Sequence, residues 1–490
     1  MMGRFLFLIE GVVGLKWLKG KVRDWLEIVP VGGEFGVSVL SDADFEREIF
    51  RNKVWYRGVC SELAGFYGSV DDLVGNRSFW AEGGRNHKIR KMHSGLPAMM
   101  VDVLADITLG DFLGVRVNSV ATAERFFHPK GEKSFPMDAN EELGIRDEEL
   151  RWQRVASENG FGALLARAVR TSLALGDGAF RVSFDDGVSG LPIIEFFGGD
   201  RVRFNYLRGR ISEVVFLHDG FEEIYHKDGI RYVALGEDTP VPADVLHGLG
   251  VILAVPLIFD ENPRFAGRGK SVFDGKIHAF DALDEVISQW VDALRDGRVQ
   301  KYVPSQMLPR DPRTGEVRGL GGFESRFVQT QMDLAEGADN SVKVVQPLID
   351  TDALEASFAG FLNLALQGVL APATLGMDLK RGDNATAQRE REKATLYTRG
   401  RIIDGLRGVL ATLVKVVLVA LDAANGEEVR DYKVAVEFGE YAAPDFGSQI
   451  EVVAKGVTAG VMSFETAVEQ LYGDTWTQEQ KADEVARLMR

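Results

Sequence analysis

The sequence predicts an α+β fold that is mainly α-helical, and three observations lead to this prediction. Apolar residues recur at helical spacings of three and four over 268–297, 351–370 and 386–422. Over 179–260, short runs with alternating apolar and polar residues lie between turn signals, which is typical of antiparallel strands. A second extended region, 298–350, lies between two of the helices and predicts a small β-containing subdomain.

The composition is that of a large globular chain without a disulfide framework. Its 490 residues are enough for about three domains, and its formal net charge is −16. This acidity argues against a protein that grips nucleic acid over its general surface, because phosphate binding requires a basic patch. The single cysteine, Cys60, excludes an intramolecular disulfide and a thiolate metal cluster.

The N-terminal region contains a run that resembles a signal or membrane segment. This run, FLFLIEGVVGLKWLKGK at 5–21, is interrupted by Glu10 and is too short to span a bilayer. We therefore prefer a short amphipathic helix that docks on protein. No transmembrane helix is expected elsewhere in the sequence.

Helices are also expected before the strands. One covers Asp44 to Tyr67, another begins at Pro97 and runs to Leu109, and a third covers Glu148 to Leu175. A basic cluster precedes Pro97, and we prefer a solvated or intersubunit face over DNA contact for it. Its members are Arg85, Lys88, Arg90 and Lys91.

One segment resembles a nucleotide-binding loop. The residues from Arg264 to Ser271 follow a strand, precede a helix and end in Gly269-Lys270-Ser271. However, Arg264 stands where a phosphate-binding loop has its first glycine, and no second strand with a metal-binding aspartate follows. We therefore interpret the segment as a polar turn that opens a helix, and a nucleotide-hydrolysing motor subunit is the weaker alternative.

The segment between the last two helical patterns cannot continue either helix. Pro372 removes a backbone donor, and Gly376 and Gly382 relax the backbone. Lys380 and Arg381 then place two adjacent positive charges at the tip of the predicted loop.

The remaining motifs give no support for an enzyme. The seven histidines are scattered, without an HExxH motif or a paired metal spacing, and no G-x-S-x-G elbow occurs. We expect no catalytic residues, no metal site and no cofactor.

Four motifs, together with the order of the predicted parts, resemble a known family. The motifs are WYRG at 55–58, HKIRKMHSGLP at 87–97, FDGKIHAFDALDEVISQ at 273–289 and DNATAQREREKATLYTRGRI at 383–402. They resemble the portal proteins of tailed phages, in particular those of long-tailed phages that infect Gram-positive hosts. The resemblance covers nearly the whole chain.

The resemblance implies a portal fold made of seven parts. These are a wing with helices and antiparallel strands (1–267, with the β region at 179–260), a stem helix (268–297), a small β-containing clip (298–350), a second stem helix (351–370), a kinked tunnel loop (371–385), a long crossing helix (386–422), and a wing return with a helical C-terminal crown (423–490).

The resemblance also implies a function. Portal proteins form a ring, usually of twelve subunits, at one vertex of the capsid, and double-stranded DNA enters and leaves through it. The implied partners are the terminase large subunit, the major capsid and scaffold proteins, and a head–tail adaptor. The implied location is the virion, after assembly in the host cytoplasm and without a membrane. Another phage head component, such as an adaptor or minor capsid protein, is the alternative.

In such a ring, the loop tip would contact DNA weakly and without sequence preference. The candidates are Lys380 and Arg381, with Leu375 and Met377 as a non-polar lip. Alternatively, the two basic residues only pair with neighbouring carboxylates between subunits, Asp378 and Asp383. The basic residues of the long helix are expected in exposed or intersubunit ion pairs. They are Arg389, Arg391, Lys393, Arg399 and Arg401.

The first stem helix supplies a second set of candidates. Its acidic side, repeated around a ring, would give a negative wall that repels the DNA phosphates and lets the duplex slide. The candidates for lining this channel, or for contacting the next subunit, are Asp281, Glu285 and Asp292.

Overall fold

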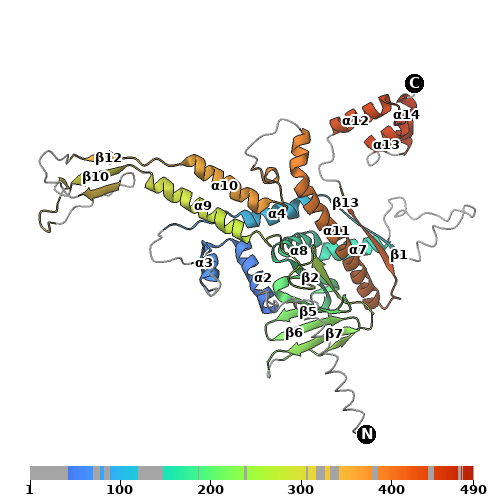
Figure 1. Ribbon diagram of the computed structural model, residues 1–490. Helices are drawn as coiled ribbons and strands as arrows, with labels where there is room; N and C mark the ends of the chain where they lie inside the picture. The colour runs from blue at the N-terminus through green and yellow to red at the C-terminus, as the bar shows by residue number, and fades with distance from the viewer. Residues whose placement is uncertain are drawn as a thin grey trace, which may run out of the picture.

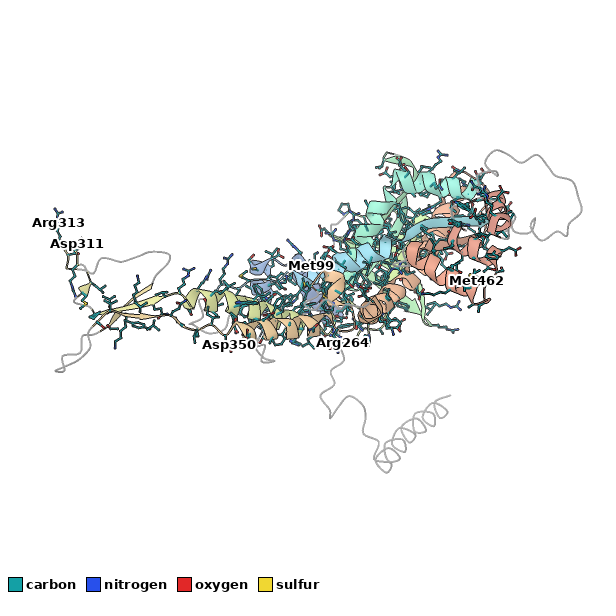
Figure 2. The ribbon with its side chains drawn as sticks, turned by 90° about the horizontal axis from the view of Figure 1, so that it is seen from above. Met99, Arg264, Asp311, Arg313, Asp350 and Met462 are labelled. Carbon is teal, nitrogen blue, oxygen red and sulfur yellow. The ribbon has the colours of Figure 1, made fainter. Side chains whose placement is uncertain are left out.

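The computed structural model confirms an α+β fold that is mainly α-helical (Figure 1). A long arm of two helices projects from a body of helices and strands (Figures 1 and 2). The structure describes residues 42–69, 78–81, 89–119, 147–185, 187–236, 240–304, 307–308, 310–315, 326–330, 341–377, 385–439, 446–472, 476 and 478–488.

The body begins with two helices where the sequence predicts one. In place of a continuous helix from Asp44 to Tyr67 there are α2 (Asp42–Arg57) and α3 (Cys60–Ser69). Gly58 ends α2, because its φ of 64° is a left-handed conformation that a helix interior does not contain. The next helix, α4 (Leu96–Leu109), begins with Pro97 in its first turn, as predicted.

A second glycine breaks another helix that the sequence predicts as continuous. Gly160, with a φ of 54°, separates α7 (Asp147–Glu158) from α8 (Phe161–Leu175). The prediction of one helix across this region is therefore wrong. A glycine inside a helical pattern is compatible with the helix, so the pattern alone does not reveal the break.

Antiparallel strands follow, as predicted between 179 and 260. They form a three-stranded sheet in the order β3-β2-β9 and a five-stranded sheet in the order β4-β5-β6-β7-β8. The strands are β2 (Asp177–Asp185), β3 (Ser189–Gly198), β4 (Val202–Leu207), β5 (Arg210–His218), β6 (Phe221–His226), β7 (Gly229–Ala234), β8 (Val245–Leu246) and β9 (Ala254–Ile258), and a short 3₁₀ turn, η2 (Gly199–Arg201), precedes β4.

One strand pair joins distant parts of the sequence. β1 (Phe112–Ser119) runs antiparallel to β13 (Tyr432–Phe438), with Val117 opposite Val434. The strand at β1 is not predicted from the sequence. Its partner lies more than three hundred residues away, so no local turn signal announces the pairing.

The core of the body is centred on α11 (Ala385–Ala424), a single helix of 40 residues. Its second half is apolar on nearly all sides and packs against β9, β13, α4 and α7. Leu406, Leu410, Leu413, Val414 and Val417 are completely buried. Each such side chain stabilises the fold by about 1.5–3 kcal/mol, so this half of α11 holds the body together.

The arm consists of α9 (Ile277–Asp296) and α10 (Thr351–Leu366), which pack side by side (Figure 1). Its outer end is a small three-stranded sheet in the order β11-β10-β12. β10 (Gln300–Pro304) pairs in parallel with β11 (Arg326–Thr330) and antiparallel with β12 (Lys343–Val345). Figure 2 shows Asp311 and Arg313 at the far tip of the arm.

Three short helices end the described chain on the side opposite the arm (Figure 1). They are α12 (Phe446–Thr458), α13 (Phe464–Tyr472) and α14 (Gln478–Leu488). Ser463 caps α13, because its hydroxyl accepts a hydrogen bond of 3.2 Å from the Thr466 N–H.

Candidate functional site

The connection from α10 to α11 is a rigid turn up to Met377. Two left-handed glycines, Gly368 and Gly376, flank a single 3₁₀ turn, η4 (Pro372–Leu375). Thr395 of α11 fixes the turn from inside. Its completely buried hydroxyl accepts a hydrogen bond of 2.8 Å from the Ala371 N–H. The loop that follows Met377 therefore starts from a fixed point on the body.

The predicted tunnel-loop residues divide into two pairs. Leu375 and Met377 are half-buried and pack against the main core, so they lie at the root of the loop. Lys380 and Arg381 lie outside the described residues, and their contact with DNA stays a prediction.

The acidic side of α9 contains a buried carboxylate within a polar cluster. Asp284 is completely buried and accepts hydrogen bonds from the Ser94 N–H at 2.8 Å and from the Trp80 indole N–H at 3.1 Å. The Nδ1 of His93 lies 2.7 Å from the same carboxylate. One turn further, Ser288 accepts a hydrogen bond from the Met92 N–H. This part of α9 therefore holds the chain segments at 78–81 and 91–95 against the helix.

Asp281, one of the predicted channel or intersubunit residues, belongs to the same contact. Its carboxylate accepts hydrogen bonds from the Ser78 hydroxyl at 2.7 Å and from the Phe79 N–H at 2.8 Å. Burial raises the pKa of Asp281, and these hydrogen bonds oppose that shift only in part. Within one chain this carboxylate serves an internal contact, and a role at a channel wall stays a prediction.

Glu285 and Asp292 of α9 are more exposed to solvent than the completely buried Asp284 of the same helix. Both are partly exposed, and Glu285 accepts a hydrogen bond of 3.0 Å from the Gln289 amide within the helix. Among the described residues, no other element of the chain binds either carboxylate. For these two residues too, a role at a channel wall or at a subunit contact stays a prediction.

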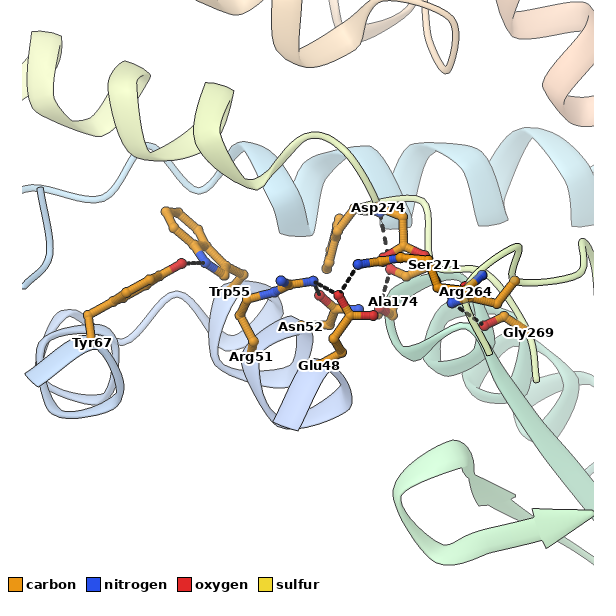
Figure 3. Close-up of polar contacts among 12 residues, drawn as sticks. Glu48, Arg51, Asn52, Trp55, Tyr67, Ala174, Arg264, Gly269, Ser271 and Asp274 are labelled. Atoms are coloured by element: carbon orange, nitrogen blue, oxygen red, sulfur yellow. Dashed lines mark hydrogen bonds and ion pairs between the residues drawn. The ribbon is translucent and has the colours of Figure 1, made fainter. Parts of the chain in front are cut away.

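The segment that resembles a nucleotide-binding loop is a structural turn before α9. The Gly269 N–H donates to Asp177 at 2.8 Å, and the Lys270 N–H donates to the Asp260 carbonyl at 2.8 Å. The Ser271 hydroxyl donates to the Ala174 carbonyl at 2.6 Å (Figure 3). Because these groups already make hydrogen bonds within the fold, they do not form a phosphate-binding loop. This agrees with the interpretation of the segment as a polar turn that opens a helix.

Arg268, which the sequence analysis did not single out, fastens this turn to the body. Its guanidinium donates two hydrogen bonds of 2.9 Å to Asp177, which is completely buried, and another to the Val202 carbonyl. It also lies over the rings of Phe45 and Phe204. An arginine in a glycine-rich turn gives no periodic signal, so its partner could not be identified from the sequence.

The basic residues of α11 do not all behave as predicted. Arg399 is buried, and its guanidinium donates to Asp111 at 2.5 Å and to the Ile107 carbonyl at 3.0 Å. The prediction of an exposed or intersubunit ion pair for Arg399 is therefore wrong. Arg399 instead links α11 to the end of α4 within the same chain. Arg401 is exposed and pairs with Asp260 of the same chain at 3.0 Å.

The arm has an apolar surface that the single chain leaves uncovered. Only Leu362, Ala365 and Leu366 are buried among the sixteen residues of α10, although most of its residues are apolar. Large apolar side chains are exposed along the whole arm. They are Leu294, Val342, Val344, Val345, Leu348 and Leu364. A surface of this kind indicates a contact with another molecule.

Metal-binding clusters and membrane-spanning helices are both absent from the described part of the chain. Among these residues, no group of three histidine, cysteine or carboxylate side chains is placed to hold a metal ion. In the same residues, no helix is long and apolar enough to cross a bilayer.

No protein-family model and no curated protein sequence matches this chain. Among solved structures, it is similar to a chain in the virion of a native gene transfer agent (GTA) particle. The identity is 13%, the TM-score is 0.38, and the match covers 80% of this chain and 89% of that chain.

It is also similar to chains in two structures of the neck of such particles. For the neck of the native GTA particle computed with C12 symmetry, the identity is 12%, the TM-score 0.35, and the coverage 80% of this chain and 89% of that chain. For the neck of the empty particle computed with C6 symmetry, the identity is 13% and the TM-score 0.37. The match covers 75% of this chain and 90% of that chain. At these values the likeness transfers no function to this chain.

Proposed function

We propose that this chain is the subunit of a portal, a ring-shaped channel at one capsid vertex through which double-stranded DNA enters and leaves. The observation that carries the proposal is the arm. Two helices and a three-stranded sheet project from a well-packed body, and several of their large apolar side chains are exposed in the described part of the chain. Identical neighbours on either side would cover these surfaces, and repeated head-to-tail contacts of this kind close into a ring.

The order of the elements supports the same proposal. A body with antiparallel sheets leads into α9, a small sheet, α10, a short turn and the long helix α11, and short helices end the described chain. This is the order of wing, stem, clip, stem, tunnel loop, crossing helix and crown that the resemblance to portals of long-tailed phages implies. An adaptor or minor capsid protein, the alternative, usually lacks this order.

Within the proposed ring, the loop after Met377 faces the DNA. Leu375 and Met377 form its apolar root, and Lys380 and Arg381 make weak, repeated contacts with the phosphates. Glu285 and Asp292 are the carboxylates that line the channel or meet the next subunit. The sheet at the arm tip is the docking surface for the terminase large subunit and later for a head–tail adaptor.

The proposal is tested by replacing Lys380 and Arg381 together with serine in particles assembled with their capsid and scaffold proteins. We expect rings of unchanged size, and an altered amount of nuclease-protected DNA for each particle. Replacing Lys227, on an exposed turn between β6 and β7, with serine is the matched control and should leave packaging unchanged. Unchanged packaging in the double variant would reject the loop assignment, and loss of the ring would show that the two residues hold subunits together.

A further inference from the structure

A pocket of about 200 Å³ lies where the arm joins the body. Its walls come from five parts of the chain that the sequence keeps far apart, one of them Leu173 of α8. Phe259 and Asp260 follow β9, Lys270 and Lys276 belong to the turn before α9, Gln367 follows α10, and Arg401 projects from α11. The pocket therefore contacts both helices of the arm near their bases as well as the central helix of the body.

The charges that line this pocket do not balance. Asp260 is paired with Arg401 at 3.0 Å. Asp274 is paired at 3.3 Å with Arg264, which lies outside the lining and is labelled with Asp274 in Figure 3. Lys270 and Lys276 also line the pocket, and neither has a carboxylate partner in the described part of the chain. Five charged side chains line the pocket, the basic Lys270, Lys276 and Arg401 and the acidic Asp260 and Asp274, so the lining carries an excess of one positive charge in a protein whose formal net charge is −16.

The two lysines differ in what already surrounds them. The Lys276 ammonium donates hydrogen bonds to the Leu364 carbonyl at 3.3 Å and to the Gln367 carbonyl at 2.6 Å, which leaves one N–H for a further acceptor. Burial lowers the pKa of Lys276, so its environment disfavours the charged form. Lys270 is half-buried, and its side chain has no hydrogen-bond or ion-pair partner among the described residues. A negative ligand would therefore satisfy both groups.

We propose that this pocket binds one small anion of the phosphate class, held between the ammonium groups of Lys270 and Lys276. Two ammonium groups without a carboxylate partner suit a phosphate group, because its several oxygens can accept from both, and charge-assisted hydrogen bonds are the strongest of their kind. A volume of about 200 Å³ has room for a tetrahedral oxyanion and a few waters, since one water occupies ~30 Å³ in the liquid. The ligand is held by side chains, because the backbone amides of the turn are already used.

Such an anion would stiffen the base of the arm. Lys276 already joins α9 to the end of α10 through its two carbonyl contacts, and Lys270 belongs to the turn that Arg268 fastens to the body. A phosphate group between the two lysines would link these contacts, so occupancy would oppose movement of the arm relative to the body. The inference stands on the pocket alone and does not depend on the proposed function.

Calorimetric titration of the full chain with inorganic phosphate, at an ionic strength held constant with sodium chloride, tests the inference. We expect saturable binding of one phosphate for each chain. Lys270→Gln and Lys276→Gln should each weaken binding by about tenfold or more, the loss of one charge-assisted hydrogen bond. Lys270→Arg keeps the charge and should bind within a few fold of the wild type. Lys227→Gln, on an exposed turn, is the matched control and should bind as the wild type does.

Two results would overturn the inference: no saturable binding to the wild type, or equal binding to the wild type and Lys270→Gln. The comparison of the wild type with Lys270→Gln remains valid even if Lys276→Gln disturbs the arm. The Lys270 side chain has no hydrogen-bond or ion-pair partner among the described residues, so its replacement should leave the fold intact. Competition with a short duplex DNA identifies the source of the phosphate. Displacement of bound phosphate assigns the pocket to a nucleic-acid backbone, and the absence of displacement assigns it to a free phosphate compound.

Discussion

Two apolar helices of this chain, α10 and the second half of α11, have opposite surroundings. In α11, Leu406, Leu410 and Leu413 are completely buried by elements of the same chain. In α10, which is also rich in alanine, leucine and phenylalanine, only three residues are buried, and Leu364 is 50% exposed. The composition of a helix thus shows that it will be covered, but it does not show which chain will cover it.

The same difference appears within one helix, α9. Phe273, Phe280, Ile287 and Leu294 share an apolar stripe with a spacing of seven. Phe273, just before the helix, and Phe280 near its start are completely buried, whereas Leu294 near the arm tip is 52% exposed. The body is therefore packed by contacts within the chain, while the arm is the part of the molecule that we propose a neighbour completes.

The largest expected effect is in the body. Phe280→Asp removes a completely buried ring that contacts Trp55 and Phe273, and it places an unpaired charge in the core. The lost packing alone costs about 3–5 kcal/mol and the buried charge adds to it, so most of the stability of a typical domain is lost. Circular dichroism and soluble yield should both show an unfolded protein. Leu294→Asp, on the same stripe, is the matched control and should fold. A wild-type melting curve for Phe280→Asp would contradict the account.

The second prediction concerns the arm. The double variant Leu348→Asp with Leu364→Asp should keep the melting temperature of the single chain, because both side chains are exposed within it. It should not assemble, because the charges would be buried without partners between subunits. Light scattering would then give a mass close to 54.0 kDa. Leu113→Asp changes a leucine of the body that is 70% exposed, and it should assemble normally. Normal rings from the arm variant would place the subunit contact elsewhere.

A smaller effect is expected from the link between body and arm. Arg268→Met leaves the completely buried carboxylate of Asp177 without its ion-pair partner. Breaking a buried pair in this way costs about 3–5 kcal/mol. Arg203→Met removes an exposed partner of Glu222 and should cost at most ~1 kcal/mol. Urea denaturation of the two variants compares these values, and similar losses would show that the Arg268 pair has no special role.

The smallest effect should depend on pH. Because burial raises the pKa of Asp281, the folded state favours its protonated form. Its contribution to stability is therefore complete below the ordinary aspartate pKa of ~3.9 and is lost as the pH rises through the folded value. The stability of the wild type relative to Asp281→Asn should thus fall between acidic and neutral pH. Urea midpoints at several pH values measure this difference, and a constant difference would contradict the assignment. Asp219→Asn, on an exposed turn, is the control.

Much of this fold could be predicted from the sequence because its signals are local. The strands between 179 and 260 and the helices α9, α10 and α11 follow from residue periodicity. The breaks at Gly58 and Gly160 could not be predicted, because glycine is compatible with a helix interior and only tertiary packing selects the left-handed conformation there. The β1–β13 pair is long-range and gives no local signal at all.

The candidate site was harder to predict than the fold. The sequence placed Asp281 on the acidic side of one helix, but it could not show that the distant Ser78 would bind it, or that Asp284 would be buried and bound by Ser94. The same limit applies to Arg399, whose partners on α4 and at Asp111 are almost three hundred residues away. Charge patterns locate charged surfaces, and only the tertiary contacts decide which charges remain available to a partner.

The mass of the purified wild-type protein in solution tests the central claim most directly. If neighbouring copies cover the arm, light scattering should give a ring of about twelve chains, 12 × 54.0 kDa or about 648 kDa. Negative-stain images of the same peak should then show a central hole. A small closed oligomer without a channel would contradict the account, because the apolar surface of the arm would then serve a different contact.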